Sequence, residues 1–124
     1  MARILVIDDS EVIRTLLMEL LTDDGHEVES VGDSRTGVSM LCEGDWDLCI
    51  CDLHLPDGNI YEILSELPKR QQLPFIFTDS LPEDLAESIH STHSHFYLRK
   101  PFDLDQVRTV LSQALLLLEE SKTP

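Results

Sequence analysis

Positive charge is scarce in this chain of 124 residues, which has nine lysine and arginine residues against 24 aspartate and glutamate residues. The formal net charge of −15 would repel a phosphate backbone, so we expect no direct binding to DNA or RNA. Long apolar runs are also missing, since no stretch approaches the roughly 18 apolar residues of a membrane span. The first residues, MARILVIDD, lack the pattern of a cleavable signal peptide. These absences predict a cytoplasmic protein without membrane contact.

Cysteine is rare as well, with three residues at Cys42, Cys49 and Cys51. An odd number, with two positions inside one apolar run, does not indicate a disulfide framework. The spacing of Cys49 and Cys51 does not fit a zinc knuckle, and no third or fourth ligand is evident. We therefore expect the cysteines to be small buried apolar residues in a reducing compartment.

Apolar runs alternate with amphipathic segments five times, with no linker between them. The predicted strands cover residues 3–7, 27–31, 48–51, 74–78 and 96–98. The predicted helices cover residues 11–22, 34–43, 60–67, 82–90 and 104–120. This alternation is typical of an α/β doubly wound fold, a parallel sheet covered by helices on both faces. The length fits one domain, which we place at residues 1–124.

Capping residues and apolar stripes support the predicted helices. Ser10 and Asp103 are placed to begin the first and last of them, and Gly25 and Gly44 to end the first two. The side chains expected to face inward are Val12, Ile13, Leu16, Leu17, Leu20 and Leu21 in the first helix, Val38, Leu41 and Cys42 in the second, and Val107, Val110, Leu111, Ala114, Leu115 and Leu118 in the last.

Polar side chains follow the predicted strands at the point where each strand ends. Asp8 and Asp9 come directly after the first strand, and Asp52 after the third. Because ligands collect at the carboxyl ends of parallel strands, we expect these carboxylates to lie close together. Crowded carboxylates repel one another unless a hard divalent cation such as Mg²⁺ lies between them. Thr78 ends the fourth predicted strand and Lys100 lies just after the fifth, and they add a hydroxyl and an ammonium group. This combination of groups indicates phosphoryl chemistry.

The order of these motifs resembles the receiver domain of two-component response regulators, the CheY-like family. The resemblance covers nearly the whole chain. It consists of the pair Asp8-Asp9, of Asp52 within DLHLPDG, of Thr78, and of the sequence KPF that begins at Lys100. It implies a flavodoxin-like sheet of five parallel strands in the order 2-1-3-4-5, accompanied by five helices.

The resemblance also implies roles for the residues at this edge of the sheet. Asp52 would accept a phosphoryl group from a phosphohistidine on a sensor histidine kinase or a histidine phosphotransfer protein. The implied ligands of Mg²⁺ or Mn²⁺ are Asp8, Asp9, Asp52 and the backbone carbonyl of His54. Lys100 and Thr78 would contact the phosphoryl oxygens. The chain would be a signalling switch that catalyses only its own phosphorylation and dephosphorylation, not a conventional enzyme.

The resemblance further implies a conformational switch. Tyr97 would turn inward as Thr78 moves toward the phosphate, and phosphorylation would shift the balance between the two states. The fourth helix, fifth strand and fifth helix would form the output face, which would control a downstream effector protein or a fused output domain. Leu116 and Leu117 lie off the inward stripe, which leaves open whether this face also docks a partner or forms a homodimer. The bond before Pro101 is a candidate cis peptide.

Three residues depart from the family pattern. Ile60 and His93 stand where glycine is usual, and Asp79 stands where a small residue is usual. A further carboxylate near the site would repel an anionic phosphodonor. We therefore expect slower phosphorylation by small donors than in a typical receiver.

The sequence is also compatible with other functions. A pseudo-receiver of the same fold would signal by protein contact without phosphorylation. A small phosphatase of the haloacid dehalogenase type would also use an aspartyl nucleophile, but it needs Asp-x-Asp where Asp8 and Asp9 are adjacent. Flavin binding is disfavoured because the loop after the first strand is acidic. The sequence does not identify the kinase, output, oligomeric state or phosphate lifetime, or whether the receiver belongs to a longer regulator or hybrid kinase.

Overall fold

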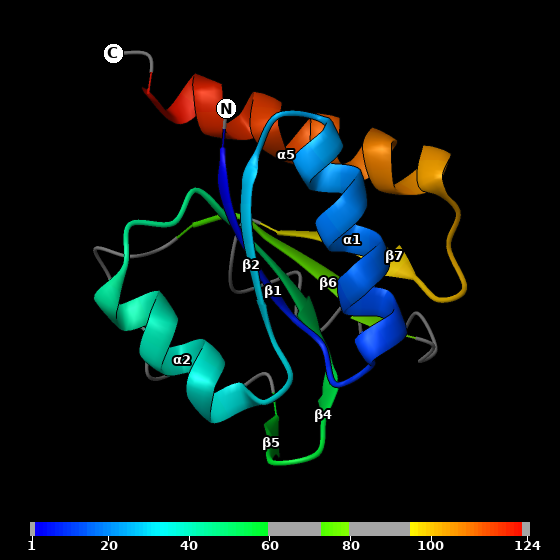
Figure 1. The fold of residues 1–124 in the computed structure, drawn as a ribbon. Helices are drawn as coiled ribbons and strands as arrows, with labels where there is room; N and C mark the ends of the chain where they lie inside the picture. The colour runs from blue at the N-terminus through cyan, green and yellow to red at the C-terminus, as the bar shows by residue number, and fades with distance from the viewer. Residues whose placement is uncertain (1, 60–72, 80–94, 123–124) are drawn as a thin grey trace.

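The architecture rests on a parallel sheet of five strands (Figure 1). The computed structural model describes residues 2–59, 73–79 and 95–122. The strands of the sheet are β1 (Arg3–Ile7), β2 (Glu27–Val31), β3 (Leu48–Asp52), β6 (Phe75–Asp79) and β7 (His95–Arg99). They stand in the order β2-β1-β3-β6-β7, in which β6 and β7 are the fourth and fifth strands of this sheet. The predicted order 2-1-3-4-5 is therefore confirmed.

A small antiparallel hairpin, absent from the sequence-based prediction, follows β3. Its strands are β4 (His54–Leu55) and β5 (Gly58–Asn59), and Pro56 and Asp57 form the turn between them. Strands of two residues are too short to display an alternating apolar pattern, so the sequence carried no signal for them. The hairpin begins directly after the end of β3 and is thus close to Asp52 in the chain.

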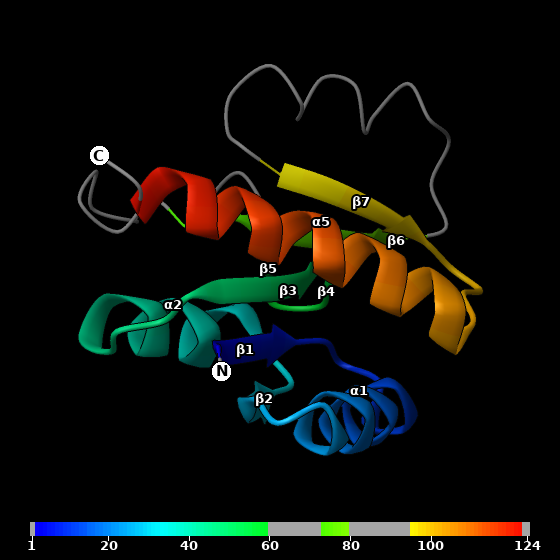
Figure 2. The same cartoon turned by 90° about the horizontal axis from the view of Figure 1, so that it is seen from above.

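The described helices are α1 (Glu11–Asp23), α2 (Ser34–Glu43) and α5 (Leu104–Lys122). α1 and α5 pack on one face of the sheet and α2 packs on the other. Figure 2 shows the strands succeeding one another from β2 at one edge to β7 at the other. The helices expected at 60–67 and 82–90 lie outside the described residues, so the total of five helices stays a prediction. No helix in the described ranges is long and apolar enough to cross a membrane.

The core lies on both faces of the sheet, as the uninterrupted apolar strands predict. Side chains alternate along β1, so that Ile4 packs with α1 and α5 whereas Ile7 packs with α2. Every residue of β3 is buried. Cys49 and Cys51 lie in the cluster on the α2 face, which confirms that these two cysteines are buried apolar residues.

The helix ends follow the capping pattern of the sequence. The Ser10 hydroxyl accepts a hydrogen bond of 3.3 Å from the Ile13 N–H at the start of α1. Gly25, just after that helix, has a φ of 90°, a conformation that glycine adopts without strain. At the start of α5, Asp103 and Gln106 each accept a hydrogen bond of 2.8 Å from the other's backbone N–H. This reciprocal arrangement is a capping box.

Two residues predicted to face inward are exposed instead. Val12 is 76% exposed on α1, and Cys42 is exposed on α2. With 3.6 residues per turn, Val12 is rotated by about 140° from Leu17, which lies at the centre of the buried side. The predicted apolar stripes were therefore too wide. The side chain of Leu118, also predicted to face inward, lies outside the described residues.

Candidate functional site

The predicted site residues meet at the carboxyl edge of the sheet. β1 pairs in parallel with β3 up to the residue before Asp52, so Asp8, the next residue after β1, lies beside it. Thr78 on β6 is the register partner of Asp52. Lys100 follows directly after β7, the strand that pairs with β6. The parallel register thus brings these residues to one place.

An acidic cluster lies at the centre of this edge. The carboxylates of Asp8, Asp9 and Asp52 each offer an oxygen within 4.8 Å of the others. Asp8 and Asp52 are only 2% and 5% exposed, whereas Asp9 is exposed. Three hard oxygen donors at this spacing fit a divalent cation, and the absence of sulfur or nitrogen from the cluster favours Mg²⁺ or Mn²⁺ over zinc.

Lys100 contacts both buried carboxylates. Its Nζ lies 3.0 Å from Oδ2 of Asp8 and 3.2 Å from Oδ2 of Asp52. Burial lowers the pKa of Lys100, but the hydrogen bond to Asp8 and the charges of both carboxylates outweigh it, so the pKa is raised. The ammonium group therefore stays charged between the ends of two strands. The Lys100–Pro101 peptide bond is cis.

Asp52 is buried at the end of β3 and held in a fixed orientation. Its Oδ1 accepts a hydrogen bond of 2.9 Å from the His54 N–H. Burial raises the pKa of Asp52, and the contacts with His54 and Lys100 lower it without restoring the ordinary value. A buried carboxyl group with charges of both signs around it is typical of a functional site.

The hydroxyl of Thr78 is buried and has no hydrogen-bond partner among the residues that the structure describes. Thr78 is 1% exposed, and its Oγ1 makes no hydrogen bond within the described part of the chain. A buried hydroxyl without a partner costs about 1–3 kcal/mol, which makes it an unusual feature to keep in a core. Because Thr78 is the register partner of Asp52, this donor is suited to an oxygen of a group bound on that carboxylate.

Two contacts that the sequence-based prediction missed hold the loop after β1. The Ser10 N–H donates to Oδ1 of Asp8 over 2.9 Å, and Nη1 of Arg14 donates to the Asp8 carbonyl over 2.7 Å. A Cβ at Gly32 would lie 2.9 Å from that Nη1, so the glycine leaves room for the guanidinium. The available signal in the sequence was Arg14, which lies five residues after the acidic pair in a chain with few cations.

The proposed switch residue lies near the site, on β7. Tyr97 is half-buried, pairs with Phe77 in the register, and packs against the cluster on the α2 face. Of the residues that depart from the family pattern, Asp79 ends β6 but its side chain lies outside the described residues. Ile60 and His93 lie outside the described residues altogether.

Comparison with known proteins places residues 4–112 in the family described as response regulator receiver domain. The chain is 35% identical over 114 residues to the DNA-binding transcriptional regulator NtrC of Bradyrhizobium sp. (strain RP501 Parasponia). This match covers 90% of this chain and 24% of that protein. NtrC of Azospirillum brasilense is 34% identical over 125 residues, covering 99% of this chain and 25% of that protein. The chain thus spans about a quarter of the length of these relatives.

Solved structures show the same fold. The chemotaxis response regulator CheY4 of Vibrio cholerae has a TM-score of 0.82 at 26% identity, covering 92% of this chain and 98% of that chain. NtrX from Brucella abortus has a TM-score of 0.87 at 26% identity, covering 98% of this chain and 28% of that chain. The CheY-like fold expected from the sequence is therefore confirmed.

Proposed function

The chain belongs to the response regulator receiver domain family of two-component systems, and we propose that it is a phosphorylation-competent switch. Asp52 would accept a phosphoryl group from a phosphohistidine on a sensor histidine kinase or a histidine phosphotransfer protein. The observation that carries this proposal is the buried hydroxyl of Thr78 beside Asp52, which has no hydrogen-bond partner among residues 2–59, 73–79 and 95–122. The carboxylate of Asp52 also contacts Lys100.

In the proposed reaction, an oxygen of Asp52 attacks phosphorus while the bond from phosphorus to the donor's imidazole nitrogen breaks. The bonding pair returns to the imidazole, and the product is an acyl phosphate. The His54 N–H holds Oδ1 of Asp52, which leaves Oδ2, on the side of Lys100, as the attacking atom. Lys100 and the Thr78 hydroxyl would then contact phosphoryl oxygens and stabilise their negative charge.

The proposed ligands of Mg²⁺ or Mn²⁺ are Asp8, Asp9, Asp52 and the backbone carbonyl of His54. When bound, such an ion would offset the charge of the carboxylates and of the phosphoryl oxygens. The Ser10 N–H holds Oδ1 of Asp8 and so fixes the orientation of this proposed ligand. The carboxylate oxygens of the acidic cluster are the ligand type that such an ion prefers.

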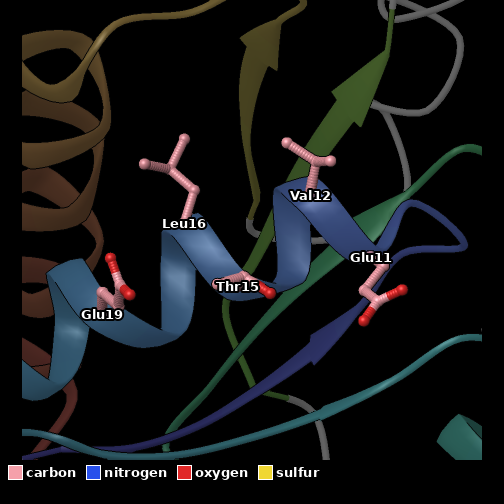
Figure 3. A pocket seen from close by; sticks show the side chains of 5 residues that line it. All are labelled: Glu11, Val12, Thr15, Leu16 and Glu19. Atoms are coloured by element: carbon pink, nitrogen blue, oxygen red, sulfur yellow. The ribbon is translucent and has the colours of Figure 1, made fainter.

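We infer that the donor protein docks over the first turns of α1. A shallow hollow on this helix is lined by Glu11, Val12, Thr15, Leu16 and Glu19 (Figure 3). Val12 follows the acidic pair by three positions and is 76% exposed. An apolar side chain that is exposed beside the site would lose water contact when a partner covers it.

The output would pass through β7 and α5. A second hollow between these elements is lined by Tyr97, Leu98, Arg99, Asp103, Asp105, Gln106, Thr109 and Val110. Further along α5, Leu116 is 57% exposed. We propose that a downstream effector, a fused output domain or a second copy of the chain covers this surface. We also propose that the switch acts in the cytoplasm.

Incubation with acetyl phosphate tests the proposal. The native chain should form a hydroxylamine-sensitive acyl phosphate in Mg²⁺ and none in a chelator, and Asp52→Ala should form none in either. Thr78→Ala should still be phosphorylated, but more slowly. A native chain that stays unmodified in saturating Mg²⁺ would support a pseudo-receiver, and sustained hydrolysis of a free phosphomonoester would support a phosphatase.

A further inference from the structure

Asp57 connects the β4–β5 hairpin to the start of α2, a contact that has no part in the proposed reaction itself. It lies in the turn of the β4–β5 hairpin, and its carboxylate accepts hydrogen bonds from the first residues of α2. Oδ1 accepts from the N–H and the hydroxyl of Ser34 over 2.8 and 2.9 Å, and Oδ2 accepts from the Arg35 N–H over 3.2 Å. Ser34 is 5% exposed, so this contact is buried on the helix side.

The start of α2 explains why a carboxylate binds there. The first N–H groups of a helix have no partner within the helix and form the positive end of its dipole. The side chain of Asp33, the N-cap, accepts a hydrogen bond of 2.7 Å from the Thr36 N–H. Asp57, 23 positions beyond Ser34, accepts from the N–H groups of Ser34 and Arg35. The Ser34 N–H is the main cause of the lowered pKa of Asp57, so these hydrogen bonds are charge-assisted.

The hairpin extends from this contact to the proposed site. β4 begins at His54, whose N–H donates to Oδ1 of Asp52 over 2.9 Å. β4 and β5 pair only His54 with Asn59 and Leu55 with Gly58. A two-stranded hairpin is at best marginally stable by itself, so one with two pairs needs contacts from outside to stay in place. Leu55, 8% exposed in the core on the α2 face, supplies one such contact, and Asp57 supplies another.

We propose that Asp57 is a positioning residue of the phosphorylation site, which anchors the hairpin on α2 and so keeps His54 where its amide orients Asp52. The inference rests on the proposed function, in which Asp52 is the phosphoacceptor and the His54 carbonyl is a metal ligand. Without the anchor, Mg²⁺ would bind more weakly and phosphorylation would slow, although every reacting group is still present. Residues that position metal ligands typically contribute about 10- to 100-fold in affinity or activity.

Asp33→Ala is a matched control for Asp57→Ala. Each substitution removes one carboxylate from the same helix end, but only Asp57 belongs to the hairpin. Two quantities are measured: the Mg²⁺ concentration that gives half the maximal rate with acetyl phosphate, and the rise in Tm that Mg²⁺ produces. Both variants should be less stable than the native chain. Asp57→Ala should need about tenfold more Mg²⁺, and Asp33→Ala should match the native chain.

The inference is wrong if Asp57→Ala has the native Mg²⁺ dependence, or if both variants shift it equally. Asp57→Asn keeps one acceptor oxygen for Ser34 and should give an intermediate Mg²⁺ requirement, and it replaces the alanine variant if that variant does not fold. Failure of the proposed function would show differently, as a native chain that forms no acyl phosphate. The Mg²⁺-induced rise in Tm would still decide the role of Asp57 in that case.

Discussion

At the scale of single residues, the charges of Asp52 and Asp57 have opposite effects on the stability of the fold. Burial raises the pKa of Asp52, and the His54 N–H and the Lys100 ammonium only partly counter it. The hydrogen bonds from Ser34, by contrast, lower the pKa of Asp57. The charged form is therefore disfavoured in the folded state at Asp52 and favoured at Asp57. The first is expected of a reactive group, and the second of a structural contact.

We predict that Asp52→Asn stabilises the metal-free protein at neutral pH, by an amount on the order of 1 kcal/mol, the usual size for one substitution. The substitution removes a carboxylate whose charge is disfavoured in the folded state. Because the pKa of Asp52 is raised in the folded state, its ionisation destabilises the fold. This destabilisation is absent below the ordinary pKa of about 3.9 and develops as the pH rises toward the folded pKa. Urea unfolding in a chelator at several pH values measures the difference.

Asp57→Asn is the control for this experiment, because the pKa of Asp57 is shifted in the opposite direction from that of Asp52. A lowered pKa gives stability that is present above the ordinary value and is lost as the pH falls through the folded pKa. Asp57→Asn should therefore destabilise at neutral pH, with a difference that shrinks in acid. An Asp52→Asn variant that is less stable than the native chain at neutral pH would contradict the described surroundings of Asp52.

At the scale of elements, the position of α2 depends on a close approach to β1. Gly37 is buried in this helix, and a Cβ there would lie 2.5 Å from Cδ1 of Ile7, a fully buried residue of β1. Glycine thus lets the helix axis come near the sheet. Since α2 also carries the contact to Asp57, the depth of its packing affects the hairpin at the site.

Gly37→Ala should destabilise the protein by about 1–2 kcal/mol, because the overpacking cost exceeds the better helix propensity of alanine. Ile7→Val removes the methyl group that the new Cβ would meet. We therefore expect the double variant to lose less stability than the sum of the two single variants, as measured by urea unfolding. Additive losses would mean that the side chain of Ile7 does not limit the approach of α2.

The helices and strands were predictable where apolar residues recur at a regular spacing. The strands and the described helices follow from apolar periodicity, and the caps Ser10 and Asp103 fix where α1 and α5 begin. The β4–β5 hairpin was not predictable, because its stability comes from contacts with α2 that are distant in the sequence. The wrong orientation of Val12 has a related cause, since a valine beside the inward stripe of a helix gives no sign of which side it faces.

At the scale of the whole molecule, the parallel register explains how a sequence pattern predicts a site. Groups that follow strand ends must share one edge of the sheet, so Asp8, Asp52 and Thr78 were expected together and are found together. The sequence does not specify which oxygen each donor contacts. The bridging position of Lys100 and the support from Arg14 depend on side-chain packing, which only the structure shows.

Docking on α1 should depend on the exposed Val12. Val12→Asn should slow phosphotransfer from a protein donor about tenfold, a loss of about 1.4 kcal/mol in the docked complex, and leave the rate with acetyl phosphate unchanged. Leu116→Asn, which also replaces an exposed apolar residue but on α5, is the control and should leave both rates unchanged. An equal effect of the two substitutions on the protein donor would show that docking does not involve α1 specifically.

We propose that Asp52 carries the phosphoryl group, with Thr78 and Lys100 around it. Peptide mass spectrometry after phosphorylation in Mg²⁺ and reduction of the acyl phosphate with borohydride tests this claim most directly. We predict a single modified position, Asp52, and its loss in Asp52→Asn. Modification at Asp8 or Asp9 instead, or at no aspartate of the native chain, would contradict it.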